Sequence, residues 1–237
     1  MSQAAPAAER VMAAVLGVLG VRKTDLPVVT LSWAQSAAGA IARPDGTPLR
    51  ISGQESMTLT HRLRAAHDAI LVGIQTVLTD DPLLSVRLPP TEPPSSQPQR
   101  QPQPVVLDSD LRFPPEARLL LRDDRKPWIF HSGNPGVKAA VLLERGARLF
   151  SVGRGPGGLD LYEVLRSLGA AGISSLMVEG GARVLRAFIT AGFAEQVVVT
   201  VSRSAVQGMP GPGMPGLVES LAETVGTDTV TWGTLNQ

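Results

Sequence analysis

Short apolar segments that read as strands alternate with segments that read as helices along most of the chain, and this alternation restricts the fold more than any other feature. Residues 174–178, 183–191 and 196–201 form one such strand–helix–strand unit. Helical crossovers of this length join parallel strands and lie on the faces of their sheet. The sequence therefore predicts an α/β layer fold with a central, largely parallel sheet.

The alternation predicts eight strands and five helices. Strands are expected at residues 27–35, 68–73, 105–107, 128–130, 147–152, 174–178, 196–201 and 229–232. Helices are expected at residues 8–19, 56–66, 137–145, 159–168 and 183–191. A proline-rich, low-complexity stretch at 88–104 and a Gly/Pro stretch at 207–216 read as loops. The part before the first loop is too short to bury a core of its own, so we expect one domain over residues 1–237.

Composition excludes several classes of function. Among the 237 residues, 22 Lys+Arg balance 21 Asp+Glu, which leaves no basic excess for nucleic acid or an anionic membrane. The absence of cysteine excludes disulfides, a thiolate nucleophile and thiolate metal ligands, and three histidines argue against a His-rich metal site. The apolar run 11–21 is too short to span a bilayer. We expect a cytoplasmic protein that holds no metal.

An apolar strand, a glycine pair and a helix follow one another in LMVEGGARVL, residues 176–185. This arrangement directs free backbone N–H groups and the positive end of the helix dipole to one point, where a phosphate group can bind. Gly180 and Gly181 would let the anion approach closely. The alternative is that the two glycines only make a tight turn, because the motif is not the dinucleotide fingerprint GxGxxG.

Residues 61–87 bring polar groups to the end of another predicted strand. Arg64 and Arg87 can together clamp a phosphate group. Asp81, which precedes a proline, reads as a turn residue. His61 and His67 read as surface or packed residues rather than catalytic ones.

Five motifs occur in order along the chain: TLSWAQSAAGAIA, ISGQES, THRLRAAHDAILVGIQTVLTDDPLLSVR, PQPVVLDSDLRFP and LMVEGGARVLRAFITAGFAEQVVV. Together they resemble the reductase domain of riboflavin biosynthesis, found both as the C-terminal half of a bacterial deaminase-reductase and as a stand-alone enzyme. The resemblance extends from Pro27 to the closing DTVTWG. It implies a dihydrofolate-reductase-like α/β fold with a mostly parallel mixed sheet, a homodimer, and NADPH-dependent reduction of the ribosyl group of a ribosylaminopyrimidine 5′-phosphate to ribityl.

The resemblance also implies roles for particular residues. Glu179 would face the substrate near the site of hydride transfer. The substrate-binding residues would be Arg64, Leu84 and Arg87, with the two arginines on the 5′-phosphate. The NADPH-binding residues would be Thr76, Asp80, Ser109, Gly180, Gly181, Ala182, Arg183 and Val184. Whether the pyrimidine is diaminated or already deaminated stays open.

The chain departs from the family pattern at one motif. The family has Ser, an aliphatic residue, Asp, Gly or Ser, and then Lys or Arg, whereas Ala38 and Ala40 replace the acid and the base here. A lost charged contact costs on the order of 10²-fold in rate. Two alternatives therefore stay open: a reductase of the same fold that acts on another substrate, and a nucleotide-binding protein without turnover.

Overall fold

The computed structural model describes residues 5–21, 24–88, 99–134 and 136–236, so most of the predicted proline-rich loop lies outside the described part. Nine strands form the main sheet in the order β12-β13-β10-β1-β9-β3-β4-β5-β6. Their bounds are Val28–Gln35 (β1), Ala69–Gly73 (β3), Gln103–Leu107 (β4), Trp128–His131 (β5), Arg148–Ser151 (β6), Ser175–Val178 (β9), Gln196–Val201 (β10), Leu217–Val225 (β12) and Asp228–Leu235 (β13). Two small sheets pair β2 (Ala40–Ala42) with β11 (Met209–Pro210) and β7 (Arg154–Gly155) with β8 (Gly158–Leu159).

Every pair of neighbouring strands from β10 through β6 is parallel, and only β13 runs antiparallel to its two neighbours. The predicted α/β class with a mostly parallel, mixed sheet is therefore confirmed. Strands β3 and β9 are buried along their whole length, and every residue in them is apolar except Ser175. A strand covered on both faces needs such an uninterrupted apolar run.

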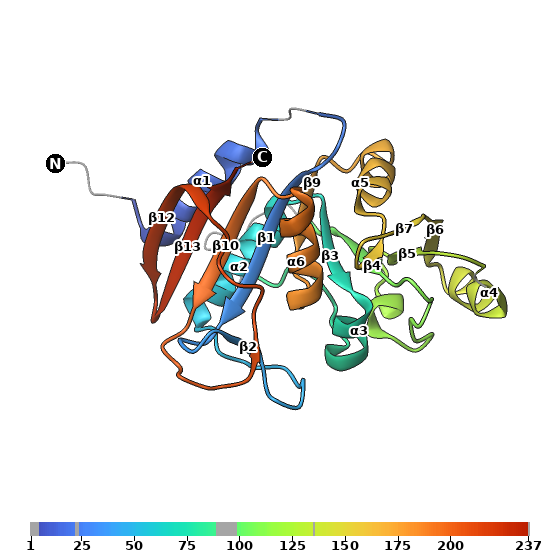
Figure 1. Ribbon diagram of the computed structural model, residues 1–237, viewed down its shortest axis with the longest axis horizontal. Coiled ribbons are helices and arrows are strands. Elements are labelled where there is room, and N and C mark those ends of the chain that lie inside the picture. The colour runs from blue at the N-terminus through green and yellow to red at the C-terminus, as the bar shows by residue number, and fades with distance from the viewer. Residues whose placement is uncertain (1–4, 22–23, 89–98, 135, 237) are drawn as a thin grey trace.

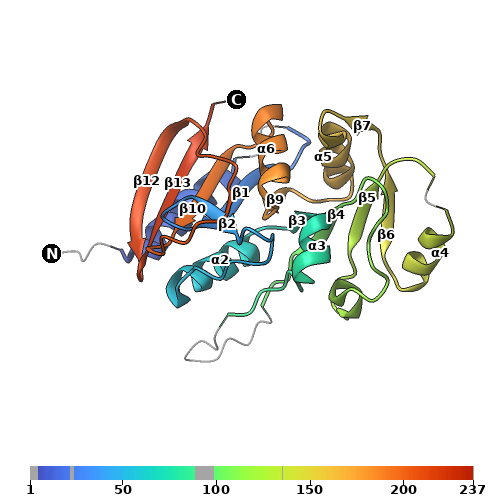
Figure 2. The same ribbon diagram turned by 60° about the horizontal axis from the view of Figure 1, so that its bottom comes forward.

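Helices cover both faces of the sheet (Figures 1 and 2). Apolar side chains of α1, α2 and α4 pack into one core cluster, and those of α5 and α6 pack into a second cluster on the opposite face. Successive residues of a strand alternate between the clusters, as Ile70 and Leu71 of β3 do. The helices span Ala7–Leu19 (α1), Gln54–Ala66 (α2), Ile74–Asp80 (α3), Gly136–Glu144 (α4), Leu161–Ala170 (α5) and Ala182–Ala191 (α6), and the 3-10 helix η1 spans Arg118–Leu121.

The structure contains several elements that the sequence did not predict, and it moves the start of one predicted strand. Residues 74–80, which read as a polar stretch, form α3, and β12 was missed because its side chains are mostly exposed. The 207–216 stretch was predicted to support no ladder, yet Met209 and Pro210 pair with β2. Strand β4 also begins inside the predicted proline-rich loop, at Gln103. The composition of the two Pro- or Gly-rich segments did not indicate strands, because their partners come from tertiary contacts.

The connections reverse direction between β3 and β9. After β3 the chain proceeds through α3 to β4, away from β1, whereas after β9 it proceeds through α6 to β10, across β1. In open α/β sheets, ligands bind outside the carboxyl ends of the strands at such a switch point. This edge lies at the bottom of Figure 1, where α3 and the β2 region are seen. A ligand site is therefore expected at this edge.

Candidate active site

An arginine and a glutamate meet at the carboxyl edge. Arg64 of α2 donates from Nε to Glu179 Oε1 at 2.7 Å and from Nη2 to Glu179 Oε2 at 2.6 Å. Both side chains are 15% exposed. Two parallel charge-assisted hydrogen bonds fix the plane of the carboxylate. The resemblance placed both residues on the substrate side, and the structure joins them directly to each other.

The glycine turn after β9 leads into α6 without a capping side chain. Gly181 is the N-cap residue, and no side chain of the described residues caps the helix by a hydrogen bond. A Cβ atom on Gly180 would lie 2.7 Å from Cβ of Val184, and one on Gly73 would lie 2.8 Å from Cγ2 of Val184, so α6 packs closely against the ends of β9 and β3. A Cβ atom on Gly181 would meet nothing within 4 Å. This open helix N-terminus fits an anionic group.

Two of the other predicted cofactor-binding residues lie on α3, which leaves the end of β3. Thr76 is half-buried and Asp80, the last residue of the helix, is exposed. Asp81 ends the helix with a left-handed backbone (φ 39°), and its Oδ1 accepts a hydrogen bond from the backbone N–H of Arg118 at 2.8 Å. The interpretation of Asp81 as a turn residue is confirmed.

Ser109 lies just beyond β4 and the loop Gly157–Gly158 approaches it. A Cβ atom on Gly158 would be 3.7 Å from Ser109 Oγ. The carbonyl of Ser109 accepts hydrogen bonds from the backbone N–H and the hydroxyl of Ser132. Arg183, in the first turn of α6, donates to the carbonyl of Gly157 at 3.0 Å. The structure thus brings Arg183 and Ser109 to the same loop.

Leu84 and Arg87 belong to an extended segment without regular pairing. Leu84 is buried and left-handed (φ 49°), while the Arg87 side chain is exposed and its Nη1 contacts Ser85 Oγ at 3.3 Å. Arg64 Nη1 donates to the carbonyl of Ser85 at 3.2 Å. The two arginines that were predicted to share a phosphate group therefore both contact Ser85.

A hollow of about 570 Å³ opens beside Arg87, lined by α2 residues that include Met57 and His61. His61 is buried, and its Nδ1 accepts a hydrogen bond from the backbone N–H of Arg87 at 3.2 Å. Burial, and then the positive charges of Arg64 and Arg87, lower the pKa of His61. The ring is therefore neutral, as an accepting Nδ1 requires.

Sequence reasoning missed Asp108 and His131. Asp108 follows β4 and His131 ends β5, next to each other in the parallel register. Both are buried, and Asp108 Oδ1 and His131 Nδ1 have no hydrogen-bond partner among the described residues. Burial raises the pKa of Asp108, although its Oδ2 accepts a hydrogen bond from the N–H of Phe113 at 2.7 Å. No spacing along the chain pairs these residues, which come from separate strands.

The departure at Ala38 and Ala40 lies at the turn into β2. Ala40 is buried, and strand β11 is paired over β2 with Pro210 opposite Ala40. A Cβ atom on Gly208 would lie 3.3 Å from the Ala40 Cβ and 2.0 Å from the carbonyl oxygen of Ala42. The backbone of the 207–216 segment thus occupies the space above β2 where a longer side chain at position 40 would lie.

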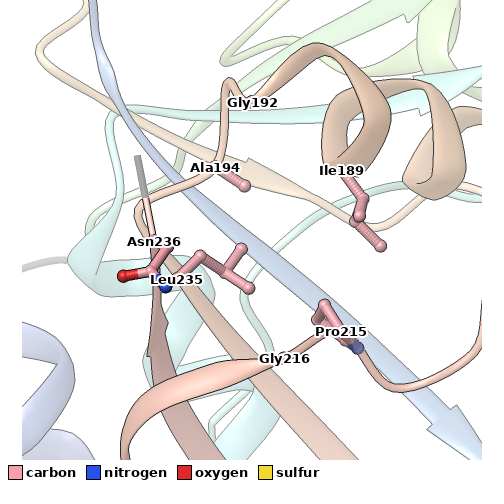
Figure 3. Close-up of a pocket in the computed structure, with 7 residues that line it drawn as sticks. All are labelled: Ile189, Gly192, Ala194, Pro215, Gly216, Leu235 and Asn236. Carbon is pink, nitrogen blue, oxygen red and sulfur yellow. The ribbon is translucent and has the colours of Figure 1, made fainter.

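A second, smaller hollow of about 190 Å³ lies at the opposite edge of the sheet (Figure 3). It is lined by Ile189 of α6, Leu235 of β13 and Pro215, with Ala194 just before β10. The register puts Gln196 opposite Thr234, so this hollow is at the amino end of β10. None of the predicted site residues lines it.

Within the described part of the chain, no group of three His, Asp or Glu side chains is arranged to hold a metal ion. Among the described residues, no helix combines the length and the apolar character that crossing a membrane requires.

The fold and the carboxyl-edge geometry together define an α/β protein with a mostly parallel sheet and a helix that begins, without a capping side chain among the described residues, at the switch point of that sheet. The model of the RibD C-terminal domain family matches residues 27–229, so the chain belongs to that family and the resemblance is confirmed. The chain is 36% identical over 186 residues to the 2,5-diamino-6-ribosylamino-4(3H)-pyrimidinone 5′-phosphate reductase of Methanothermobacter thermautotrophicus, covering 77% of this chain and 80% of that protein.

The chain is also 36% identical over 176 residues to the riboflavin biosynthesis protein RibD of Aquifex aeolicus, covering 74% of this chain and 46% of that protein. The chain therefore spans about half the length of this relative. Among solved structures, Acinetobacter baumannii RibD superposes with a TM-score of 0.74 at 22% identity, covering 90% of this chain and 59% of that one. A riboflavin biosynthesis reductase of Saccharomyces cerevisiae superposes with a TM-score of 0.72 at 24% identity, covering 91% and 93%. Both likenesses confirm the fold.

Proposed function

We propose that the protein is an NADPH-dependent reductase that converts the ribosyl group of a ribosylaminopyrimidine 5′-phosphate to ribityl in riboflavin biosynthesis. The observation that carries this proposal is the Arg64–Glu179 pair beside the open N-terminus of α6, at the switch point of the sheet. Family membership supports it, because the archaeal relative is named for this reduction. We take residues 1–237 to act as one reductase domain.

The residues at the carboxyl edge fit the cofactor NADPH, nicotinamide adenine dinucleotide phosphate in its reduced form. Its phosphate groups would lie against Gly180, Gly181 and the first turn of α6, residues 182–184, where no side chain caps the helix. Thr76 and Asp80 of α3 and Ser109 after β4 would bind the remainder. When bound, the cofactor supplies the hydride for C1′ of the ring-opened sugar.

On the substrate side, Arg64 holds the Glu179 carboxylate in one orientation, in which it would face the reacting sugar. Leu84 would contact the substrate from its fixed backbone position, and Arg87, exposed at the mouth of the hollow, would bind the 5′-phosphate. Catalysis would rest mainly on orientation and electrostatics.

Two alternatives predict different behaviour. A reductase of the same fold that acts on another carbonyl or imine compound fits the buried Ala40 and the covered β2 region. A nucleotide-binding protein without turnover would keep the α6 site and bind NADPH without consuming it.

The test is NADPH oxidation, followed by absorbance, with the diaminated and the deaminated ribosylaminopyrimidine phosphates, beside a binding titration of NADPH and of NADH. Turnover with one substrate supports the proposal and identifies the order of deamination and reduction. Tight binding of NADPH without turnover of either substrate would favour the two alternatives.

We further propose a homodimer, as the resemblance implies. Light scattering on the purified protein across a concentration series gives the mass directly. A monomer at all concentrations would contradict this part of the proposal.

A further inference from the structure

Among the described residues, the segment that carries Leu84 and Arg87 pairs with no strand. Residues 82–88 have no regular secondary structure, and left-handed backbone conformations occur at Asp81 and Leu84. A non-glycine residue with positive φ is strained unless its surroundings hold it. The N–H and C=O groups of this segment must therefore find their partners elsewhere.

Two glutamines from the low-complexity run provide those partners on both sides of Arg87. Gln101 accepts from the Val86 N–H at 2.8 Å and donates to the Val86 carbonyl at 3.1 Å. Gln99 accepts from the Leu88 N–H at 3.2 Å and donates to the Leu88 carbonyl at 3.0 Å. Each side-chain amide thus makes hydrogen bonds to both the N–H and the C=O of one residue, as the backbone of a neighbouring strand would.

The spacing of Gln99 and Gln101, two residues apart in the low-complexity run, explains this arrangement. In extended chain, residues two apart project to the same side, so Gln99 and Gln101 face Leu88 and Val86 together. Pro102 follows and has no N–H to give to a ladder, whereas a glutamine side chain carries both a donor and an acceptor. We call these four hydrogen bonds, from Gln99 to Leu88 and from Gln101 to Val86, the glutamine ladder.

Other side chains hold the rest of the segment. On the opposite side of the chain, the Arg87 N–H donates to His61. Arg122, whose side chain is 4% exposed, donates from Nη1 to the carbonyls of Leu83 and Leu84 at 3.1 and 3.2 Å. The backbone on both sides of Arg87 is thereby fixed before any ligand arrives.

We propose that Gln99 and Gln101 are positioning residues that hold Arg87 ready for the phosphate group of the substrate. The inference rests on the proposed function, in which Arg87 binds the 5′-phosphate. A side chain as flexible as arginine loses less entropy on binding when its backbone is already ordered. Gln99 and Gln101 of the low-complexity run therefore contribute to substrate affinity.

The experiment compares Gln101→Met and Gln99→Met, which keep the side-chain length and remove the amide, with Arg87→Ala as the reference for complete loss. We expect each glutamine variant to raise KM for the phosphorylated substrate by about 10-fold, with kcat and the Kd of NADPH changed by less than about twofold. Gln101→Glu keeps an acceptor for the Val86 N–H but loses the donor to its carbonyl, so its KM should be intermediate. Gln207→Met, an exposed glutamine outside the ladder, is the matched control.

Two further measurements separate positioning from general loosening. KM for the substrate without its phosphate group should not change in the glutamine variants, because Arg87 then has no ligand. Parallel changes in KM, kcat and the Kd of NADPH, or an unchanged KM for the phosphorylated substrate, would overturn the inference.

Failure of the proposed function can be distinguished from failure of the inference. If the wild-type protein turns over neither pyrimidine, the proposed reaction is wrong, but calorimetric titration with ribose 5-phosphate still reports on Arg87. Weaker binding of ribose 5-phosphate in Gln101→Met and Gln99→Met than in wild type and Gln207→Met would support the ladder. Equal binding in all four, or no binding to the wild type, would refute it.

Discussion

Arg64 and Glu179 are separated by 115 residues in the sequence, yet they form a bidentate ion pair at the carboxyl edge. Each side chain is mostly withdrawn from water, so either charge alone would be poorly solvated. Removing one partner therefore costs more than the pair itself contributes, because the other charge is left buried and unpaired.

A double-mutant cycle with Arg64→Met and Glu179→Gln tests this coupling. We expect each single variant to lower the free energy of unfolding by about 2 kcal/mol, and the double variant to lose about 1 kcal/mol less than the sum of the two. Urea unfolding of the four proteins measures the coupling. Strict additivity would show that the two groups do not stabilise each other. Both single variants should also lose at least about 10²-fold in kcat/KM.

A substitution at Ala40 tests whether the lost basic residue limits turnover. Family members have Lys or Arg there, so a sequence argument predicts that Ala40→Lys raises turnover. In the structure Ala40 is buried beneath the Gly208 backbone, so a lysine would have to displace the β2–β11 pairing. We expect Ala40→Lys to lower turnover and the melting temperature, and Ala40→Ser to leave both nearly unchanged. Higher turnover in Ala40→Lys would show that the segment moves aside.

At the level of elements, the start of α6 combines three features in one turn. Gly180 allows a close approach to Val184, Gly181 faces open space, and the helix dipole adds partial positive charge at its uncapped end. Close packing against Val184 leaves no room for a side chain at Gly180, whereas Gly181 has room for one. The two neighbouring glycines therefore have different roles.

Gly181→Asp should weaken NADPH binding by at least about 10-fold while the melting temperature stays near that of the wild type. The backbone of Gly181 (φ −65°) suits any residue and a Cβ atom there meets nothing, but the new carboxylate would repel the cofactor phosphates. Fluorescence titration with NADPH measures the Kd. Gly216→Asp, at another glycine with open space around it, is the control. Unchanged cofactor affinity in Gly181→Asp would remove the phosphate assignment.

At the scale of the whole molecule, a buried polar network joins α2 to three strands. His67 Nδ1 lies 2.7 Å from the carbonyl of Leu63, so this nitrogen carries the proton and Nε2 accepts from Thr30 Oγ1 at 2.8 Å. Gln196 donates to Thr30 at 2.9 Å and accepts from the Trp232 indole at 2.8 Å. The network needs a neutral His67, and burial lowers the pKa of that ring.

This network makes stability depend on pH. The folded-state pKa of His67 lies below its ordinary value of 6.5, so below about pH 6.5 the unfolded chain binds more protons than the folded one. The contribution of His67 is therefore complete above that pH and is lost as the pH falls toward the folded pKa. The pKa of His61 is lowered too and acts in the same direction.

We expect the free energy of unfolding, measured with urea, to fall between about pH 7 and pH 5 and to fall less steeply in His67→Gln. The variant should be less stable than wild type at neutral pH, because it cannot reproduce both hydrogen bonds of the ring. His131→Gln is the control for a buried histidine outside the network. An identical pH slope in His67→Gln and wild type would show that His67 does not titrate on unfolding.

The sequence by itself determined the α/β class, most strands of the sheet and the glycine turn before α6, because periodicity and turn chemistry are local properties of the chain. The resemblance added the list of site residues. Neither indicated β12, whose exposed side chains carry little apolar signal, nor α3, which is only seven residues long.

Only the tertiary structure decided which of those residues act together. Arg64 pairs with Glu179, and Gly208 covers Ala40, across long stretches of sequence. Asp108 and His131 are buried with one side-chain atom each that has no partner among the described residues. The run containing Gln99 and Gln101 was interpreted only as a low-complexity loop. Its composition does not indicate which backbone groups elsewhere in the chain need hydrogen-bond partners. Such complementarity exists only once the strands are assembled, since it depends on distances in space and not on spacing along the chain.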